Sequence, residues 1–100
     1  MSETVFELNG STLTVKPVGA LDSITSPVFE EEFRRKMPGA DKIIVDLEKV
    51  DYISSAGLRV FLAAEQYVEK QNAEMKLIHV NENIMEVFEL VGFLDVISVE

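Results

Sequence analysis

The sequence contains no cysteine and no tryptophan, and only one of its 100 residues is a histidine. Without cysteine, the chain can form neither a disulfide framework nor a thiolate zinc site. No apolar run approaches the ~18 residues of a membrane-spanning helix, and the polar start, Met-Ser-Glu-Thr, does not resemble a signal peptide. These absences predict a soluble, cytoplasmic protein.

The motifs of several enzyme classes are also missing. A serine hydrolase needs a base beside its nucleophile, but the only histidine, His79, lies in an apolar segment that we expect to be a strand. Neither a Gly-x-x-x-x-Gly-Lys phosphate loop nor a Gly-x-Gly-x-x-Gly turn occurs. Acidic residues are numerous, but their spacing indicates solvated faces rather than a metal cluster. We therefore expect a protein that is not an enzyme and that uses no cofactor or metal ion.

Positive charge is scarce. The chain has 9 Lys and Arg against 18 Asp and Glu, which gives a formal charge of −9 and a pI near 4.5. Nucleic acids and anionic membranes would be repelled, so neither is expected as a partner. A basic protein surface is a better match, although the same acidity would serve solubility alone. A length of 100 residues, 47% of them hydrophobic, predicts one domain over residues 1–100.

Two β-rich runs begin the chain. They cover residues 4–8 and 11–18 and flank Asn9-Gly10, a dipeptide that predicts a hairpin with a two-residue turn and positive φ at both positions. Ser26 followed by Pro27 predicts a helix N-cap and a first helical residue.

Apolar periodicity beyond this point predicts alternating strands and helices. Helices are expected over residues 27–37, 58–71 and 81 or 82–91, strands over 42–47 and 75–80, and a short final strand within 93–99. The order β-β-α-β-α-β-α-(β) predicts an α/β fold with a mixed β-sheet and helices packed largely on one face.

The most informative stretch separates the strand at 42–47 from the central helix. Ser54 and Ser55 there are natural N-cap residues, because a short side-chain oxygen accepts an unpaired backbone N–H of the first helical turn. The same N–H groups and the positive end of the helix dipole favour a bound anion. Local chemistry thus leaves two interpretations open, a plain helix cap or a site for a negatively charged group.

Residues 51–58, Asp-Tyr-Ile-Ser-Ser-Ala-Gly-Leu, resemble the signature of the STAS domain, and in particular that of the stand-alone anti-sigma factor antagonists, also called anti-anti-sigma factors. Residues 19–22 are similar to the family's Gly-x-Leu-Asp motif, and residues 89–93 are similar to its closing Leu-x-Gly-Leu region. The resemblance covers essentially the whole chain and implies the STAS fold.

In this family a partner kinase phosphorylates the hydroxyl residue that lies two positions before the glycine, which corresponds to Ser55. Ser54 is the alternative site. It stands where many members have Asp, and Ala56 stands where many have a second Ser or Thr. The resemblance implies that the unphosphorylated protein binds an anti-sigma factor that is itself a serine kinase, and so frees the sigma factor. Phosphorylation ends the binding, and a PP2C-type phosphatase restores it.

We expect the docking surface to combine the turn before the central helix with the loop before the first helix, since both lead into helices at the same end of the sheet. The protein itself is expected to be a monomer or weak dimer. The residues expected at the docking surface are Asp22, Ser23, Ile24, Thr25, Ser26, Asp51, Ser54, Ser55, Ala56, Gly57, Leu58 and Arg59.

Two other functions compete with this one. A non-switching STAS scaffold or adaptor, such as a stressosome-like subunit or a transporter-associated partner, would use the same fold without a phosphate. An aspartyl phosphorelay receiver also alternates strands and helices, but it needs an acidic pair after its first strand, and none follows the first strands here.

Overall fold

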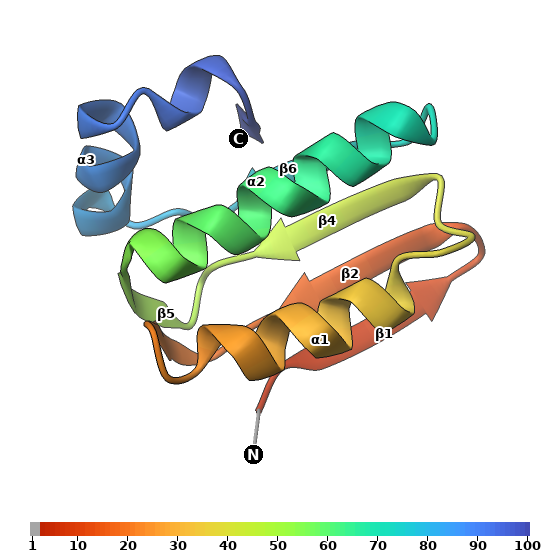
Figure 1. Ribbon diagram of the computed structural model, residues 1–100, viewed down its shortest axis with the longest axis horizontal. Helices are drawn as coiled ribbons and strands as arrows, with labels where there is room; N and C mark the ends of the chain where they lie inside the picture. The colour runs from red at the N-terminus through yellow and green to blue at the C-terminus, as the bar shows by residue number, and fades with distance from the viewer. Residues whose placement is uncertain (1–2) are drawn as a thin grey trace.

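The structure is a computed structural model that describes residues 3–100, so residues 1–2 of the expected domain lie outside the described part. Strands and helices alternate along most of this range (Figure 1). In chain order the elements are β1 (Val5–Asn9), β2 (Thr12–Lys16), β3 (Gly19–Leu21), α1 (Ser26–Lys36), β4 (Lys42–Asp46), β5 (Val50–Ile53), α2 (Ser55–Lys70), β6 (Glu74–Ile78), α3 (Glu82–Leu90), the 3-10 helix η1 (Phe93–Asp95) and β7 (Ser98–Val99).

The main sheet has five strands in the order β1-β2-β4-β6-β7. Only the β1–β2 pair is antiparallel, and the other neighbours run parallel. Helices α1 and α2 lie side by side over one face of this sheet, and α3 lies at one end (Figure 1). The predicted mixed α/β fold with helices largely on one face is therefore confirmed. None of the helices in the described range is long and apolar enough to cross a membrane.

The core lies between the sheet and the two covering helices. Phe29 and Phe33 of α1 and Phe61 of α2 are almost fully buried. The Phe29 ring contacts the Phe33 ring at a centroid distance of 5.5 Å and meets the Phe61 ring edge-on at 6.0 Å. The contact between Phe29 and Phe61 packs α1 against α2.

The hairpin forms as predicted, but its turn lies one residue further along the chain. Asn9 pairs with Thr12, so the two turn residues are Gly10 and Ser11. Only Gly10 has a positive φ, at 65°. The prediction that both Asn9 and Gly10 would adopt positive φ is wrong, because β1 continues through Asn9. Gly10 is therefore the first residue of the turn, a position that needs positive φ in a type II′ turn and that glycine adopts most easily.

Two further expectations are corrected. Ser26 is not the N-cap of α1: its backbone N–H already donates to the Asp22 carbonyl, four residues back, so Ser26 is the first helical residue and Thr25 is the cap. His79 is not part of a strand, because β6 ends at Ile78 and His79 adopts a left-handed φ of 57° with an exposed side chain.

Strands β3 and β5 were not predicted as a pair. They form a separate two-stranded parallel sheet whose register shifts between Gly19 and Ala20. This small sheet carries the loop that leads into α1 and the turn that leads into α2. It therefore brings together two segments that are about thirty residues apart in the chain.

Candidate functional site

The turn into α2 is fixed by Ser54. Its Oγ accepts a hydrogen bond from the Ala56 backbone N–H at 3.2 Å, as an N-cap side chain does, and donates to the Leu21 carbonyl at 3.3 Å. The Ser54 backbone N–H donates to the same carbonyl at 2.9 Å. Ser54 is therefore half-buried and joins the start of α2 to the end of β3.

Gly57 brings the first turn of α2 against β3 and β5. A Cβ atom at this position would lie 2.8 Å from Cγ1 of Ile53 and 2.9 Å from both Cβ and O of Leu21. Because real Cβ atoms do not approach so closely, only glycine allows the helix to begin here without displacing its neighbours.

The loop before α1 is a compact hydrogen-bonded turn. One oxygen of Asp22 accepts from the backbone N–H groups of Ile24 and Thr25, both at 2.9 Å. The Thr25 hydroxyl donates to the Ala20 carbonyl at 2.7 Å and accepts from the Asp22 N–H at 3.0 Å. The N–H groups of Thr25 and Ile24 stabilise the charged carboxylate and lower the pKa of Asp22 below its ordinary value. The loop is thus closed by its own hydrogen bonds, and it exposes 82% of Ile24.

Ser55, the first residue of α2, is exposed. Its hydroxyl makes no hydrogen bond to any residue in the described range 3–100. The two candidate serines therefore differ: the Ser54 hydroxyl is engaged in the cap, whereas the Ser55 hydroxyl is free at the positive end of a 16-residue helix.

The residues expected at the docking surface divide into two groups. Nine are exposed or half-buried at this end of the molecule, and the other three, Ser26, Gly57 and Leu58, are buried. The buried Ser26 Oγ has no hydrogen-bond partner among residues 3–100. The accessible nine are Asp22, Ser23, Ile24, Thr25, Asp51, Ser54, Ser55, Ala56 and Arg59.

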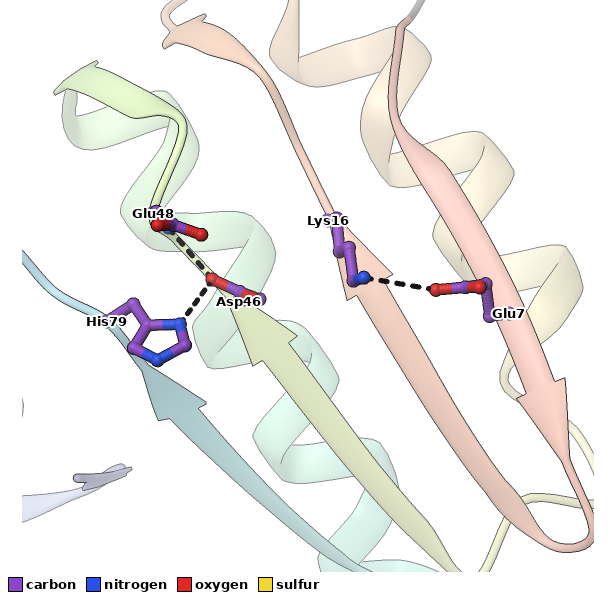
Figure 2. Close-up of polar contacts among 5 residues, drawn as sticks. All are labelled: Glu7, Lys16, Asp46, Glu48 and His79. Atoms are coloured by element: carbon purple, nitrogen blue, oxygen red, sulfur yellow. Dashed lines mark hydrogen bonds and ion pairs between the residues drawn. The ribbon is translucent and has the colours of Figure 1, made fainter.

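Sequence reasoning missed a polar cluster at the ends of β4 and β6. Side-chain atoms of Asp46, Glu48 and His79 all lie within 4.8 Å of one another. Figure 2 shows them on the face of the sheet that α1 and α2 leave uncovered, near the ion pair between Lys16 and Glu7. Parallel strands end at one edge of a sheet, so an acid at the end of one strand and a histidine at the end of the next could have indicated this proximity.

Asp46 connects the cluster. Its Oδ1 lies 3.0 Å from Nδ1 of His79 and accepts from the Glu48 backbone N–H at 3.0 Å. Partial burial raises the pKa of Asp46, but the hydrogen bonds from Glu48 and His79 outweigh it, and the net pKa is lowered. Asp, Glu and His are donors that a divalent metal accepts, but Oδ1 of Asp46 is already used twice. These contacts support a structural role for Asp46, which joins the end of β4 to the segment after β6.

The STAS domain family model matches residues 4–100. The chain belongs to the STAS domain family. It is 34% identical over 82 residues to the putative anti-sigma factor antagonist BtrV of Bordetella bronchiseptica, with 81% of this chain and 71% of that protein covered.

Solved structures share the fold at lower identity. An anti-sigma factor antagonist from Mycobacterium paratuberculosis superposes with a TM-score of 0.87 at 18% identity, covering 99% of this chain and 85% of that one. The phosphorylated form of SpoIIAA, a Bacillus cell fate determinant, superposes with a TM-score of 0.75 at 16% identity, covering 97% and 90%.

Proposed function

We propose that residues 1–100 act as one STAS domain and serve in the cytoplasm as an anti-sigma factor antagonist. The unphosphorylated protein, a monomer or weak dimer, binds a cognate anti-sigma factor that is itself a serine kinase, and so frees the sigma factor. Phosphorylation of Ser55 ends the binding, and a PP2C-type phosphatase restores it. The relationship to BtrV supports the general role, and the phosphorylation proposal is supported by SpoIIAA, a protein of the same fold that has been solved in a phosphorylated form.

The observation that carries the proposal is the free, exposed hydroxyl of Ser55 at the first position of α2. A phosphate there adds about 1.5–2 negative charges. The helix N-terminus tolerates that charge, with a favourable interaction of about 0.3–2 kcal/mol, so the domain need not unfold. The same phosphate weakens the binding of a partner, because an unpaired dianion enclosed in an interface costs several kcal/mol of binding free energy.

The surroundings of Ser55 suit a surface that recognises the neutral hydroxyl. Ile24 offers an apolar side chain on a hydrogen-bonded loop, and Arg59 is an exposed cation one turn into α2. Asp22 and Asp51 carry negative charge at the same end of the molecule, and each adds repulsion to a phosphate. The neutral Ser55 hydroxyl therefore favours docking, and a phosphate on Ser55 opposes it.

Ser54 suits phosphorylation less well than Ser55. A phosphate on its Oγ would remove the hydroxyl hydrogen that is donated to the Leu21 carbonyl and would disturb the cap to Ala56. Modification of Ser54 would thus cost stability, whereas modification of Ser55 leaves both contacts in place.

The test is incubation of the protein with the anti-sigma factor kinases of its own organism and ATP, followed by intact mass measurement and a binding assay. We expect one added phosphate on the wild type and on Ser54→Ala, and none on Ser55→Ala. Ser55→Ala should bind its kinase like the unmodified protein, and Ser55→Glu should bind at least about tenfold more weakly while keeping its circular dichroism spectrum.

Three results would contradict the proposal. Quantitative phosphorylation of Ser55→Ala would assign the modified site to Ser54. Equal affinity of Ser55→Glu and the wild type for the kinase would show that negative charge at this position does not control binding. Tight binding of a kinase that never adds a phosphate identifies the non-switching scaffold or adaptor instead.

A further inference from the structure

The ends of β4 and β6 bring three metal-binding side chains together on the uncovered face of the sheet. Asp46 ends β4, Glu48 follows two residues later, and His79 comes directly after β6. One ligand atom from each, an imidazole nitrogen or a carboxylate oxygen, lies within 4.8 Å of the other two. Within residues 3–100, no other three His, Asp or Glu side chains are placed in this way.

The distances between these atoms suit a zinc ion. Nδ1 of His79 lies 3.0 Å from Oδ1 of Asp46. Two ligands of a tetrahedral zinc ion, with bonds of ~2.0–2.2 Å, stand about 3.3–3.6 Å apart. Three atoms within 4.8 Å of one another share a point about 2.8 Å or less from each, so small rotations of the side chains reach bonding distance. The Glu48 and His79 side chains are exposed and free to make these rotations.

Asp46 is held in place and still has a free ligand atom. Its side chain is only 14% exposed, and its Oδ1 accepts from the Glu48 backbone N–H and contacts the His79 ring. Its Oδ2 has no hydrogen-bond partner among residues 3–100. Asp46 can therefore bind an ion through Oδ2 while Oδ1 keeps its bond to the Glu48 N–H. A metal ion on Nδ1 of His79 leaves the hydrogen of the neutral ring on Nε2.

The donor set and the nearby charges select the kind of ion. One imidazole nitrogen with two carboxylate oxygens suits zinc, whereas Mg²⁺ and Ca²⁺ prefer oxygen ligands alone. The formal charges of Asp46 and Glu48 balance the two positive charges of the ion. Lys16 and Lys49 line the same depression as the two acids and oppose a cation, although Nζ of Lys16 is paired with Glu7 at 3.2 Å (Figure 2).

We propose that Nδ1 of His79 and one carboxylate oxygen each from Asp46 and Glu48 bind a single zinc ion, with water as the fourth ligand. The ion joins the end of β4 to the segment that leads into α3, and it stabilises the folded chain because the unfolded chain lacks the site. The spacing of acidic residues did not indicate a metal site, since His79 lies 33 residues from Asp46. The site shares no residue with the Ser55 surface.

The test is titration of zinc chloride into the full, untagged and metal-free chain, followed by calorimetry and by NMR of the imidazole nitrogens. His79 is the only histidine, so the ring signals belong to it alone. We expect one zinc ion per chain, a changed chemical shift of Nδ1 and a hydrogen on Nε2. Zinc should also raise the melting temperature of the wild type.

Matched variants separate the three ligands from general acidity. His79→Asn should weaken zinc binding at least about tenfold, and asparagine tolerates the φ of 57° at this position, as Asn72 does elsewhere in the chain. Glu48→Gln should weaken binding by a similar factor. The control Glu69→Gln removes the same charge from an exposed position of α2 and should leave binding unchanged.

Undiminished binding by His79→Asn or Glu48→Gln would overturn the proposal, as would an equal loss in the control. Ligation through Nε2, several equivalent zinc ions per chain or no measurable binding would overturn it as well. A zinc-dependent rise in melting temperature that His79→Asn retains would show that the ion stabilises the chain from another site.

Discussion

At the scale of single residues, three serines with similar sequence surroundings have three different environments. Ser54 caps α2, Ser55 is free and exposed, and Ser26 is buried with an unpaired hydroxyl. The sequence identified Ser54 and Ser55 as cap candidates, but the helix expected from residue 58 begins at Ser55. It could not distinguish them fully, because the deciding contact is with the Leu21 carbonyl, 33 residues away. For Ser26, the predicted helix start was one residue too late, because the hydrogen bonds in the loop of Asp22 and Thr25 let α1 begin at Ser26 itself.

These environments predict opposite effects on the free energy of unfolding. Ser54→Ala should lower it by about 1 kcal/mol, since the Ala56 N–H loses its cap. Ser26→Ala should leave it unchanged or raise it by up to about 1 kcal/mol, because a buried hydroxyl without a partner is removed. Urea denaturation of the two variants and the wild type measures both. A loss for Ser26→Ala as large as that for Ser54→Ala would show that the Ser26 hydroxyl has a partner.

At the scale of secondary structure, the position of α2 depends on the small β3–β5 sheet. Gly57 lies in the first turn of the helix, where Leu21 and Ile53 leave no room for a side chain. The glycine in the Ser-Ser-Ala-Gly-Leu sequence is therefore required by packing, in addition to any role in recognition.

Gly57→Ala should destabilise the protein by about 1–3 kcal/mol through overpacking. In an exposed helix interior the same change would stabilise by about 1 kcal/mol, because alanine is the better helix former. The control is Ala63→Gly at an exposed position of α2, which should lower stability by about 1 kcal/mol. Greater stability in thermal denaturation of Gly57→Ala would contradict the tight contact.

Most elements were predictable from the sequence, but the short strands β3 and β5 were not. The hairpin, the three helices, β4, β6 and the closing strand follow from apolar spacing and turn residues. Strands β3 and β5 have only three and four residues, too few to show a period, and they are stabilised by pairing with each other. The Asp46–His79 contact was not predicted for a different reason: it requires that the ends of β4 and β6 lie side by side, which the order of the strands in the sheet decides.

At the scale of the whole molecule, two carboxylates link stability to pH. The pKa values of Asp22 and Asp46 are both below the ordinary 3.8 in the folded protein. The unfolded chain therefore takes up protons first on acidification. The stability that these groups contribute is complete above their unfolded pKa and is lost as pH falls through their folded values.

We expect the free energy of unfolding to fall on acidification below about pH 4. Urea titrations at neutral and acidic pH measure the fall. Asp22→Asn and Asp46→Asn should each be less stable than the wild type at neutral pH and should lose less on acidification. An acid-induced loss of the same size in both variants and the wild type would assign the effect to other carboxylates.

The contact between Gly57 and Leu21 has a consequence for kinetics. Because the start of α2 is packed tightly against β3 and the Asp22 turn is closed by its own hydrogen bonds, both segments of the proposed docking surface have a fixed conformation before any partner binds. When a partner binds, these two segments therefore lose little conformational entropy. Differences in affinity between related chains at this end should accordingly arise in the lifetime of the complex more than in the rate of encounter.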